Sequence, residues 1–535
     1  MRLLALAAMF ASGAATQAFA PPRLQIDSGV IEGVRFGSAP NETAFLGIPF
    51  AAPPVGARRW KPPQAVARWS GVRKASALGP GCPQSHEDVA FFETLAAEAR
   101  AAESYYAFRA DEDCLTLNVW TTAAQSNARR PVMVWFHFGG NIAGAGAFPA
   151  YGPALARKGV VYVSFNYRLG ALGFLAHPEL TAESPHRVSG NYALLDQIAA
   201  LQWVRRNIAR FGGDPGNVTI FGESAGGVMV CYLMASPLAR GLFHRAIMQS
   251  CTCAGYVSPE LRSPVASFGG KGTAEEMGVR AARAMGIAAG PGELAAMRRK
   301  TPEEIERAVA RDGTINFYAG GTVDGWVLTE QPAETFRKGK QARVPVIVGS
   351  NSDEGSRSVL DPATVANYRA WLAEMFGAHA GEVFATYPAE RDDGVARAFR
   401  SLHDDFERGH AAWAMARHVT ASGGRAYLYY FSYPGKGATA GDGAFHGIDT
   451  AFVAGGHFRR SRWGEPDAAD WALAGVMSGY WTEFAARGDP NGGGQPQWER
   501  YEVVADRCLE IGREIRMRVV PHVERFAVFE RWLLR

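Results

Sequence analysis

NVTIFGESAGG, residues 217–227, joins one short apolar run to a second apolar segment, 228–234. The first run predicts a buried strand and the second a helix, which places a Gly-x-Ser-x-Gly pattern in a strand–turn–helix context. The glycines permit a tight turn that lifts the Ser224 hydroxyl above the sheet edge, and the helix N-terminus favours negative charge there. We therefore predict that Ser224 is a nucleophile; the alternative is a glycine-rich turn with a solvated serine.

Short apolar runs alternate with helical stretches through the rest of the chain. Continuous apolar runs suit a parallel sheet that is covered by helices on both faces. The runs predicted as strands are 131–136, 160–165, 217–221, 246–249, 345–348 and 426–431, and the clearest helix is 192–209. Segment 258–340 has a mainly helical pattern, and we expect it to form an insertion that caps the active site. The pattern predicts an α/β fold with a central, mostly parallel sheet.

A serine nucleophile needs a histidine base and an acid that orients it, and in this type of fold the chain order is serine, acid, histidine. Asp353 and Glu354 both follow the strand predicted at 345–348, and position alone does not separate them. His446 lies in a loop after the strand predicted at 426–431, at a strand end where such sheets place their chemistry. Three other histidines fall in a helical stretch, and we expect them to be structural: His403, His410 and His418.

The acyl-transfer intermediate carries an oxyanion, which needs preorganised backbone N–H groups. The run His137-Phe138-Gly139-Gly140-Asn141 follows the strand predicted at 131–136. Glycines let the backbone approach a substrate oxygen closely. We expect Gly139 and Gly140 to donate there together with Ala225; a plain Gly-Gly turn is the alternative.

Composition limits the remaining choices. The 535 residues carry a formal charge of +4, and no basic stripe interleaved with aromatics points to nucleic acid. The N-terminus has a short apolar run and an Ala18-Phe19-Ala20 cleavage pattern, so we expect a signal peptide over 1–20, export to the periplasm or medium, and a single mature domain over 21–535. An exported chain can keep disulfides, and none of the six cysteines has zinc-site spacing.

Taken together, these residues resemble the type-B carboxylesterases, a family of serine esterases that includes the cholinesterases. The likeness covers nearly all of the chain after residue 20. The segments that carry it are AFLGIPFAAPPVGARRWKPPQ (44–64), EDCLTLNV (112–119), PVMVWFHFGG (131–140), NYRLGALGFL (166–175), GNYALLDQIAALQWVRRNIARFGGDP (190–215), VTIFGESAGG (218–227), SNSDEGS (350–356), HGIDTAFVAG (446–455) and YWTEFAARGDPN (480–491).

The resemblance implies the α/β-hydrolase fold, hydrolysis of small carboxylic esters, and no cofactor or metal. It implies a triad of Ser224, Glu354 and His446, which favours Glu354 over Asp353. It also implies a Cys82–Cys114 disulfide. We then expect Glu223, which precedes the predicted nucleophile, to modify the electric field in the substrate pocket or to bind a water.

The chain departs from the family pattern at several places. Phe138 stands where the family usually has the first of three glycines, and we expect it to shape the pocket. Loop 83–113 has no tryptophan to hold a choline by cation–π contact, although Phe91, Phe92, Tyr105, Tyr106 and Phe108 are aromatic. Cys251 and Cys253 stand where the family commonly has small residues, and a disulfide to Cys231 or Cys508 and free thiols all remain open.

The basic cluster His457–Arg462 is either a solvated surface run or an attractor of acidic esters. Two other functions compete with an esterase: an interfacial lipase, and a non-catalytic binding or adhesion protein on the same fold. The sequence says nothing of the oligomeric state, but it lacks a stretch long enough for stable membrane insertion.

Overall fold

The computed structural model describes residues 20–90, 109–125, 127–148, 151–253, 257–264, 272–312, 315–317, 320–355, 358–435, 443–455 and 466–533. Most of the signal peptide, the five aromatic candidates of loop 83–113 and the cluster His457–Arg462 therefore lie outside the described residues.

Eleven of the described strands form one sheet, in the spatial order β14-β13-β12-β11-β10-β9-β7-β8-β6-β4-β3. They are β3 (Val34–Arg35), β4 (Thr43–Pro49), β6 (Thr116–Thr121), β7 (Arg130–Phe136), β8 (Val161–Phe165), β9 (Gly213–Glu223), β10 (Arg245–Gln249), β11 (Val346–Asn351), β12 (Ala426–Phe431), β13 (Arg507–Ile511) and β14 (Ile515–Val519). Strands β8, β7, β9, β10, β11, β12 and β13 run parallel, and antiparallel pairs complete both edges. A small second sheet contains β1 (Arg23–Ile26), β2 (Gly29–Glu32) and β5 (Val72–Lys74).

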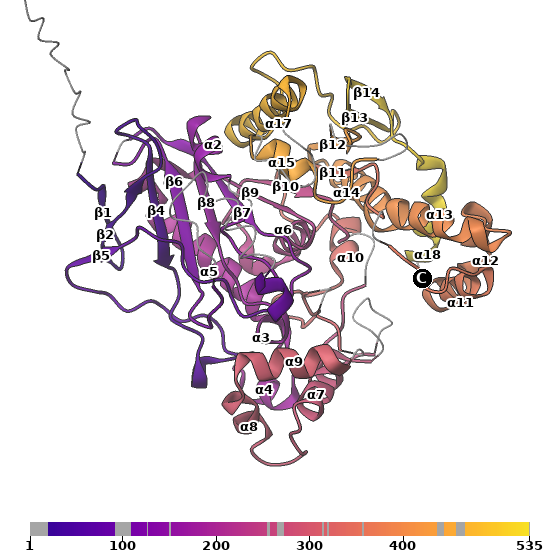
Figure 1. Ribbon diagram of the computed structural model, residues 1–535, viewed down its shortest axis with the longest axis horizontal. Coiled ribbons are helices and arrows are strands. Elements are labelled where there is room, and N and C mark those ends of the chain that lie inside the picture. The colour runs from indigo at the N-terminus through magenta and orange to yellow at the C-terminus, as the bar shows by residue number, and fades with distance from the viewer. Residues whose placement is uncertain are drawn as a thin grey trace, which may run out of the picture.

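Helices cover both faces of the large sheet (Figure 1). They are α2 (Gly152–Arg157), α3 (Gly170–Phe174), α4 (Pro178–Glu183), α5 (Tyr192–Asn207), α6 (Ala225–Ala235), α7 (Ala274–Ala284), α8 (Glu293–Arg299), α9 (Pro302–Asp312), α10 (Pro332–Arg337), α11 (Val365–Phe376), α12 (Ala380–Thr386), α13 (Asp392–His403), α14 (His410–Ala421), α15 (Asp449–Val453), α17 (Ala468–Arg487) and α18 (Ala527–Leu533).

Two buried clusters of apolar side chains, one on each face, hold these layers together. The first joins one face of the sheet to α5, α6 and α14, and the second joins the other face to α2, α15 and α17. The central strands contribute to both clusters because successive side chains point to opposite faces. Burial on both faces explains why these strands are continuous apolar runs in the sequence, and it confirms the predicted class of fold.

Several boundaries differ from the sequence expectation. Helix α5 ends at Asn207, and a 3-10 turn over Ile208–Phe211 leads to Gly212, whose left-handed φ of 80° terminates the helical run. Strand β9 extends from Gly213 to Glu223 because it pairs with β7 and β10 on its two sides.

Two long helical connections join neighbouring core strands, one from β10 to β11 and one from β11 to β12; Figure 1 labels their helices. Helices α7 to α10 lie between β10 and β11, within the predicted insertion 258–340, and α8 and α9 contact α4 and α3. A second group, α11 to α14, lies between β11 and β12 and includes a π-helical turn at Asp404–Gly409. The stretch around 403–418 was predicted to be helical, but this second insertion was not predicted, because insertion between two neighbouring strands is a property of strand order.

Candidate active site

Ser224, His446 and Glu354 come from three separate loops and form a hydrogen-bonded chain. The Oγ of Ser224 lies 2.9 Å from Nε2 of His446, and Nδ1 of His446 lies 2.5 Å from Oε2 of Glu354. Ser224 follows β9, Glu354 follows β11 and His446 follows β12. These strands are parallel, so their carboxyl ends meet at one edge of the sheet.

The structure separates Glu354 from Asp353, which the sequence alone did not. The N–H of Asp353 donates to the carbonyl of Ala444 at 2.9 Å, so its backbone is paired with the histidine loop. The Glu354 carboxylate also accepts from Ser250 Oγ at 2.6 Å and from the N–H of Asn351 at 2.7 Å, both on Oε1. Burial is the largest effect on the Glu354 pKa and raises it, but His446, Arg408 and the Ser250 hydroxyl together hold the pKa below its usual value.

Glu223 is a second buried carboxylate beside the imidazole. Its Oε1 lies 3.3 Å from Nε2 of His446, and its side chain is 3% exposed. Burial raises the Glu223 pKa to about 7, against the opposing effect of His446. Burial also acts to lower the His446 pKa, but Glu223 and Glu354 outweigh it and the net shift is upward. The base therefore lies between two carboxylates, one on each ring nitrogen.

The turn that carries Ser224 requires glycine on both sides. Ser224 has φ 55°, a left-handed conformation that is strained for a serine. A Cβ on Gly226 would lie 2.0 Å from the carbonyl oxygen of Phe136, and a Cβ on Gly222 would lie 2.5 Å from the carbonyl carbon of Gly226. The two glycines thus let the turn pack directly on the end of β7, which raises the serine at the sheet edge.

The predicted oxyanion residues occupy the loop after β7 and the first turn of α6. Gly139 and Gly140 have positive φ values of 111° and 63°, and Ala225 is the first residue of α6. A Cβ on Gly139 would lie 2.2 Å from the carbonyl oxygen of Ala143, so only glycine fits there. The carbonyl of Asn141 accepts from the N–H of Gly170 at 2.8 Å, which ties the loop to α3.

His137 and Phe138 anchor the start of this loop. The His137 ring stacks on Tyr167 with centroids 4.2 Å apart, and the Tyr167 hydroxyl donates to the His137 carbonyl at 2.8 Å. Burial lowers the pKa of His137 to about 4, so its imidazole is neutral at pH 7. The Phe138 ring is partly buried against the cluster that contains α2, α15 and α17, on the same side as Phe445, the neighbour of His446.

Known proteins are similar to this chain in sequence and in fold. The sequence profile described as the Carboxylesterase family matches residues 20–528. The chain belongs to the carboxylesterase family. It is 37% identical to the fumonisin B1 esterase of Sphingopyxis macrogoltabida, in a match that covers 89% of this chain and 84% of that protein. It is 33% identical to liver carboxylesterase 1 of Oryctolagus cuniculus, in a match that covers 95% of this chain and 93% of that protein. A solved thermophilic PNB esterase superposes with a TM-score of 0.79 at 28% identity, over 95% of this chain and 99% of that one.

The family and these relatives establish carboxylic ester hydrolysis as the activity and the α/β-hydrolase fold as its frame. Among the described residues of this carboxylesterase, no helix combines the length and the apolar character needed to cross a membrane.

Four of the six cysteines are paired in the carboxylesterase. Cys82 bonds to Cys114, and Cys231 on α6 bonds to Cys253 after β10. Cys251 and Cys508 are buried free thiols. The sulfur atoms of Cys231, Cys251 and Cys253 lie within 4.8 Å of one another, but two of them share a disulfide and are not available as metal ligands.

Several residues of the carboxylesterase that position Glu354 and the loop of His446 were not predicted from the sequence. Ser250 supports Glu354, and Asn351 connects two loops, since its N–H donates to Glu354 and its Nδ2 donates to the Phe445 carbonyl at 3.0 Å. Asp449 accepts from Gln249 Nε2 and from the Tyr429 hydroxyl, each at 2.8 Å, at the start of α15. Ser250 lies in no motif, and Asn351 and Asp449 lie in the segments 350–356 and 446–455, which carry the family resemblance but do not indicate these contacts. Their positions beside predicted strand ends were the available signal.

Proposed function

We propose that the chain is an exported serine carboxylesterase that forms an acyl-enzyme on Ser224. The observation that carries this proposal is the hydrogen-bonded chain from Ser224 through His446 to Glu354, beside a glycine loop and a helix N-terminus. In this arrangement a base accepts the serine proton while backbone N–H groups stabilise the oxyanion.

The reaction proceeds in two halves. His446 Nε2 takes the Ser224 proton as Oγ attacks the ester carbonyl, and Gly139, Gly140 and Ala225 donate their N–H groups to the oxyanion. Glu354 orients the ring and stabilises the imidazolium, which then protonates the leaving alcohol. Water attacks the acyl-enzyme with His446 again as the base, and Ser224 is regenerated.

Phe138 and Glu223 are proposed to shape the environment of the bound ester. Phe138 replaces a small residue at the start of the glycine loop, so we expect it to exclude bulk on its side of the pocket. Glu223 lies against the ring nitrogen that faces Ser224, and its charge stabilises the imidazolium during the reaction.

The substrate class is a small carboxylic ester, and the relatives suggest one compound to test directly. The protein from Sphingopyxis macrogoltabida is named for fumonisin B1, and fumonisin B1 therefore belongs in the substrate panel. An interfacial lipase would differ by a sharp rise of rate above the solubility limit of its ester. A binding or adhesion protein on this fold would show no Ser224-dependent turnover.

Export is proposed from the N-terminal pattern, with cleavage after residue 20 and one mature domain over 21–535. The two disulfides support export, since such bonds persist in oxidising compartments. Mass spectrometry of the protein from periplasm and medium would decide the matter. A mature N-terminus at Pro21 is expected, and an intact Met1 in the cell interior would contradict it.

The proposed function is tested by hydrolysis of p-nitrophenyl esters from acetate to palmitate. We expect turnover by the wild-type protein and its loss, by about 10⁴-fold or more, in Ser224→Ala. Equal rates for the two proteins would refute an acyl-enzyme on Ser224. Trapping the acyl-enzyme with a slowly hydrolysed ester and locating the added mass on Ser224 would give a second, independent test.

A further inference from the structure

The second helical insertion lies against the loop that carries Glu354. The contact is made at Gly355, the residue that follows the acid. A Cβ on Gly355 would lie 2.6 Å from the carbonyl oxygen of Arg400 and 3.1 Å from Oδ1 of Asp404. Because only glycine allows this approach, the backbone of the acid loop lies directly on the junction of α13 with the π-helical turn.

Asp404 makes the polar contact at this junction. Its Oδ1 accepts a hydrogen bond from the N–H of Gly355. Asp404 is the first residue of the π-helical turn, and such turns are frequent at functional sites. Glu354 is thus held on both sides, by Asn351 and Ser250 on its carboxylate and by Asp404 on the following peptide.

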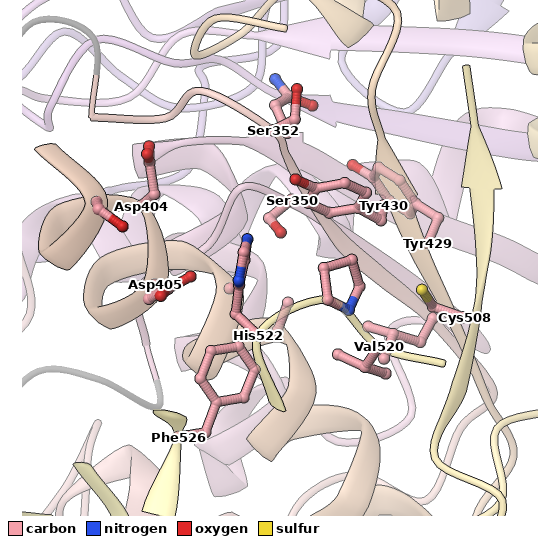
Figure 2. A pocket seen from close by; sticks show the side chains of 16 residues that line it. Ser350, Ser352, Asp404, Asp405, Tyr429, Tyr430, Cys508, Val520, His522 and Phe526 are labelled. Atoms are coloured by element: carbon pink, nitrogen blue, oxygen red, sulfur yellow. The ribbon is translucent and has the colours of Figure 1, made fainter. Parts of the chain in front are cut away.

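A small cavity of about 50 Å³ lies beside this contact, which is room for a few waters. Figure 2 shows the side chains that line this cavity. Asp404 and Asp405 lie on one side, Ser350 and Ser352 lie near the end of β11, and His522 lies between the two aspartates and Ser350. Asp405 is tied separately to the Tyr387 hydroxyl at 2.9 Å and to Arg525 at 3.2 Å. Asp404 is therefore the carboxyl of this pair that faces the acid loop.

We infer that Asp404 is a positioning residue for Glu354: it holds the Gly355 peptide and so fixes the carboxylate that orients His446. This inference rests on the proposed function of Ser224, Glu354 and His446. It gives the second insertion a role in catalysis through the acid, without contact with the substrate.

The charge state of Asp404 follows from its surroundings. Burial is the largest cause that raises the Asp404 pKa to about 8; the Gly355 N–H opposes it, and the nearby carboxylates add to it. The raised pKa favours the uncharged form of Asp404, which adds no further negative charge next to Glu354. The titratable groups that face it or line the same cavity are Asp353, Glu354, Asp405, Tyr429, Tyr430, Cys508 and His522.

The test compares Asp404→Ala with Asp404→Asn. The alanine variant loses the acceptor, so we expect kcat to fall about tenfold with KM within about twofold. In the pH profile of kcat/KM for Asp404→Ala, the loss of activity on the acid side should occur at lower pH than in wild type. The reason is that a displaced Glu354 raises the pKa of His446 by a smaller amount. The asparagine variant keeps an uncharged acceptor, so its kcat should stay within about threefold of wild type with an unmoved acid limb.

Asp392→Ala is the matched control. It removes a bond of the same kind, from the N–H of Val365 to an Asp392 carboxylate at 2.8 Å, on the same insertion but on an exposed helix start. Its kcat and acid limb should equal those of wild type. If it behaves like Asp404→Ala, the effect comes from the insertion as a whole and the inference is wrong.

A readout without turnover separates this inference from the proposed function. The proton between His446 Nδ1 and Glu354 should give a far-downfield ¹H resonance in wild type and Asp404→Asn, and a lost or shifted one in Asp404→Ala. An unchanged resonance and kcat in Asp404→Ala would overturn the positioning role, whatever the outcome for Ser224→Ala. If the alanine variant fails to fold, Asp404→Ser takes its place. If the acid limb of kcat/KM moves to lower pH in Asp404→Asn, an uncharged acceptor is not sufficient, and the uncharged role of Asp404 is wrong.

Discussion

Oε1 of Glu223 lies 3.3 Å from Nε2 of His446, the ring nitrogen that also lies 2.9 Å from Oγ of Ser224. The nucleophile and a buried carboxylate thus face the same nitrogen. A positive charge that forms on the ring is stabilised from this side by Glu223 and from the other by Glu354. The pH dependence of the enzyme therefore depends on both carboxylates.

Glu223→Gln should shift that pH dependence. The His446 pKa is raised in the folded protein, and the base must be neutral to act, so activity falls as pH falls through this pKa. Removing the Glu223 charge lowers the His446 pKa, and the acid limb of kcat/KM should move to lower pH. At pH 8, kcat should fall about tenfold because the imidazolium is less stabilised.

The measurement is kcat/KM for p-nitrophenyl acetate from pH 5 to pH 9. Glu183→Gln serves as the control, because it also replaces a glutamate by glutamine but breaks a partly exposed ion pair with Arg298 that does not involve His446. An acid limb at the same pH in wild type and Glu223→Gln would show that the Glu223 charge does not act on His446.

Ser250→Ala should weaken the hold on Glu354 without removing it. The substitution deletes the 2.6 Å bond to Oε1 but leaves the Asn351 N–H in place. A buried hydrogen bond to a charged group contributes about 1.5–3 kcal/mol, part of which should appear in the transition state as a loss of kcat of about tenfold. Steady-state kinetics decide this, with Ser432→Ala as the control, because it removes a bond of the same kind from a serine hydroxyl to Glu510 at 3.1 Å. Full activity in Ser250→Ala would contradict the prediction.

Gly226→Ala should prevent correct formation of the serine turn. Its Cβ would meet the Phe136 carbonyl oxygen at 2.0 Å, a distance that requires the turn and β7 to move apart. We expect a loss of more than about 2 kcal/mol in unfolding free energy and loss of esterase activity.

Gly381→Ala is the matched control for that substitution. Gly381 lies in α12 with nothing within 4 Å of an added Cβ, and alanine favours helix. Thermal unfolding should show an unchanged or slightly raised Tm. A Gly226→Ala protein with wild-type Tm and kcat would show that the turn tolerates a side chain.

The Cys82–Cys114 bond should stabilise the protein measurably. It closes a loop with a sequence separation of 32, for which restriction of the unfolded chain predicts about 3–4 kcal/mol. The double substitution Cys82→Ala with Cys114→Ala should lower Tm by several degrees in calorimetry while kcat changes little. Cys508→Ala, at a buried free thiol, is the comparison, and equal Tm values for the two variants would contradict the prediction.

Local pattern was enough to predict residues that the structure brings together in one hydrogen-bonded chain. Ser224 and its flanking glycines form a contiguous motif, and the apolar runs around it identify a covered parallel sheet because strands buried on both faces have no polar alternation. His446 and the pair Asp353 and Glu354 followed from their places after predicted strands. The resemblance to a family then favoured Glu354 over Asp353 and suggested the Cys82–Cys114 pairing that the structure contains.

Tertiary structure alone decided the second disulfide and the residues that support Glu354, because these contacts join residues that are far apart in the chain. Whether Cys253 or Cys251 pairs with Cys231 depends on how β10 meets α6, and the answer is Cys253. Ser250, Asn351 and Asp404 acquire their roles only when three strand ends and the second insertion converge on Glu354. A single serine, asparagine or aspartate in a loop has no periodicity and no motif, so its function exists only in the geometry of its neighbours.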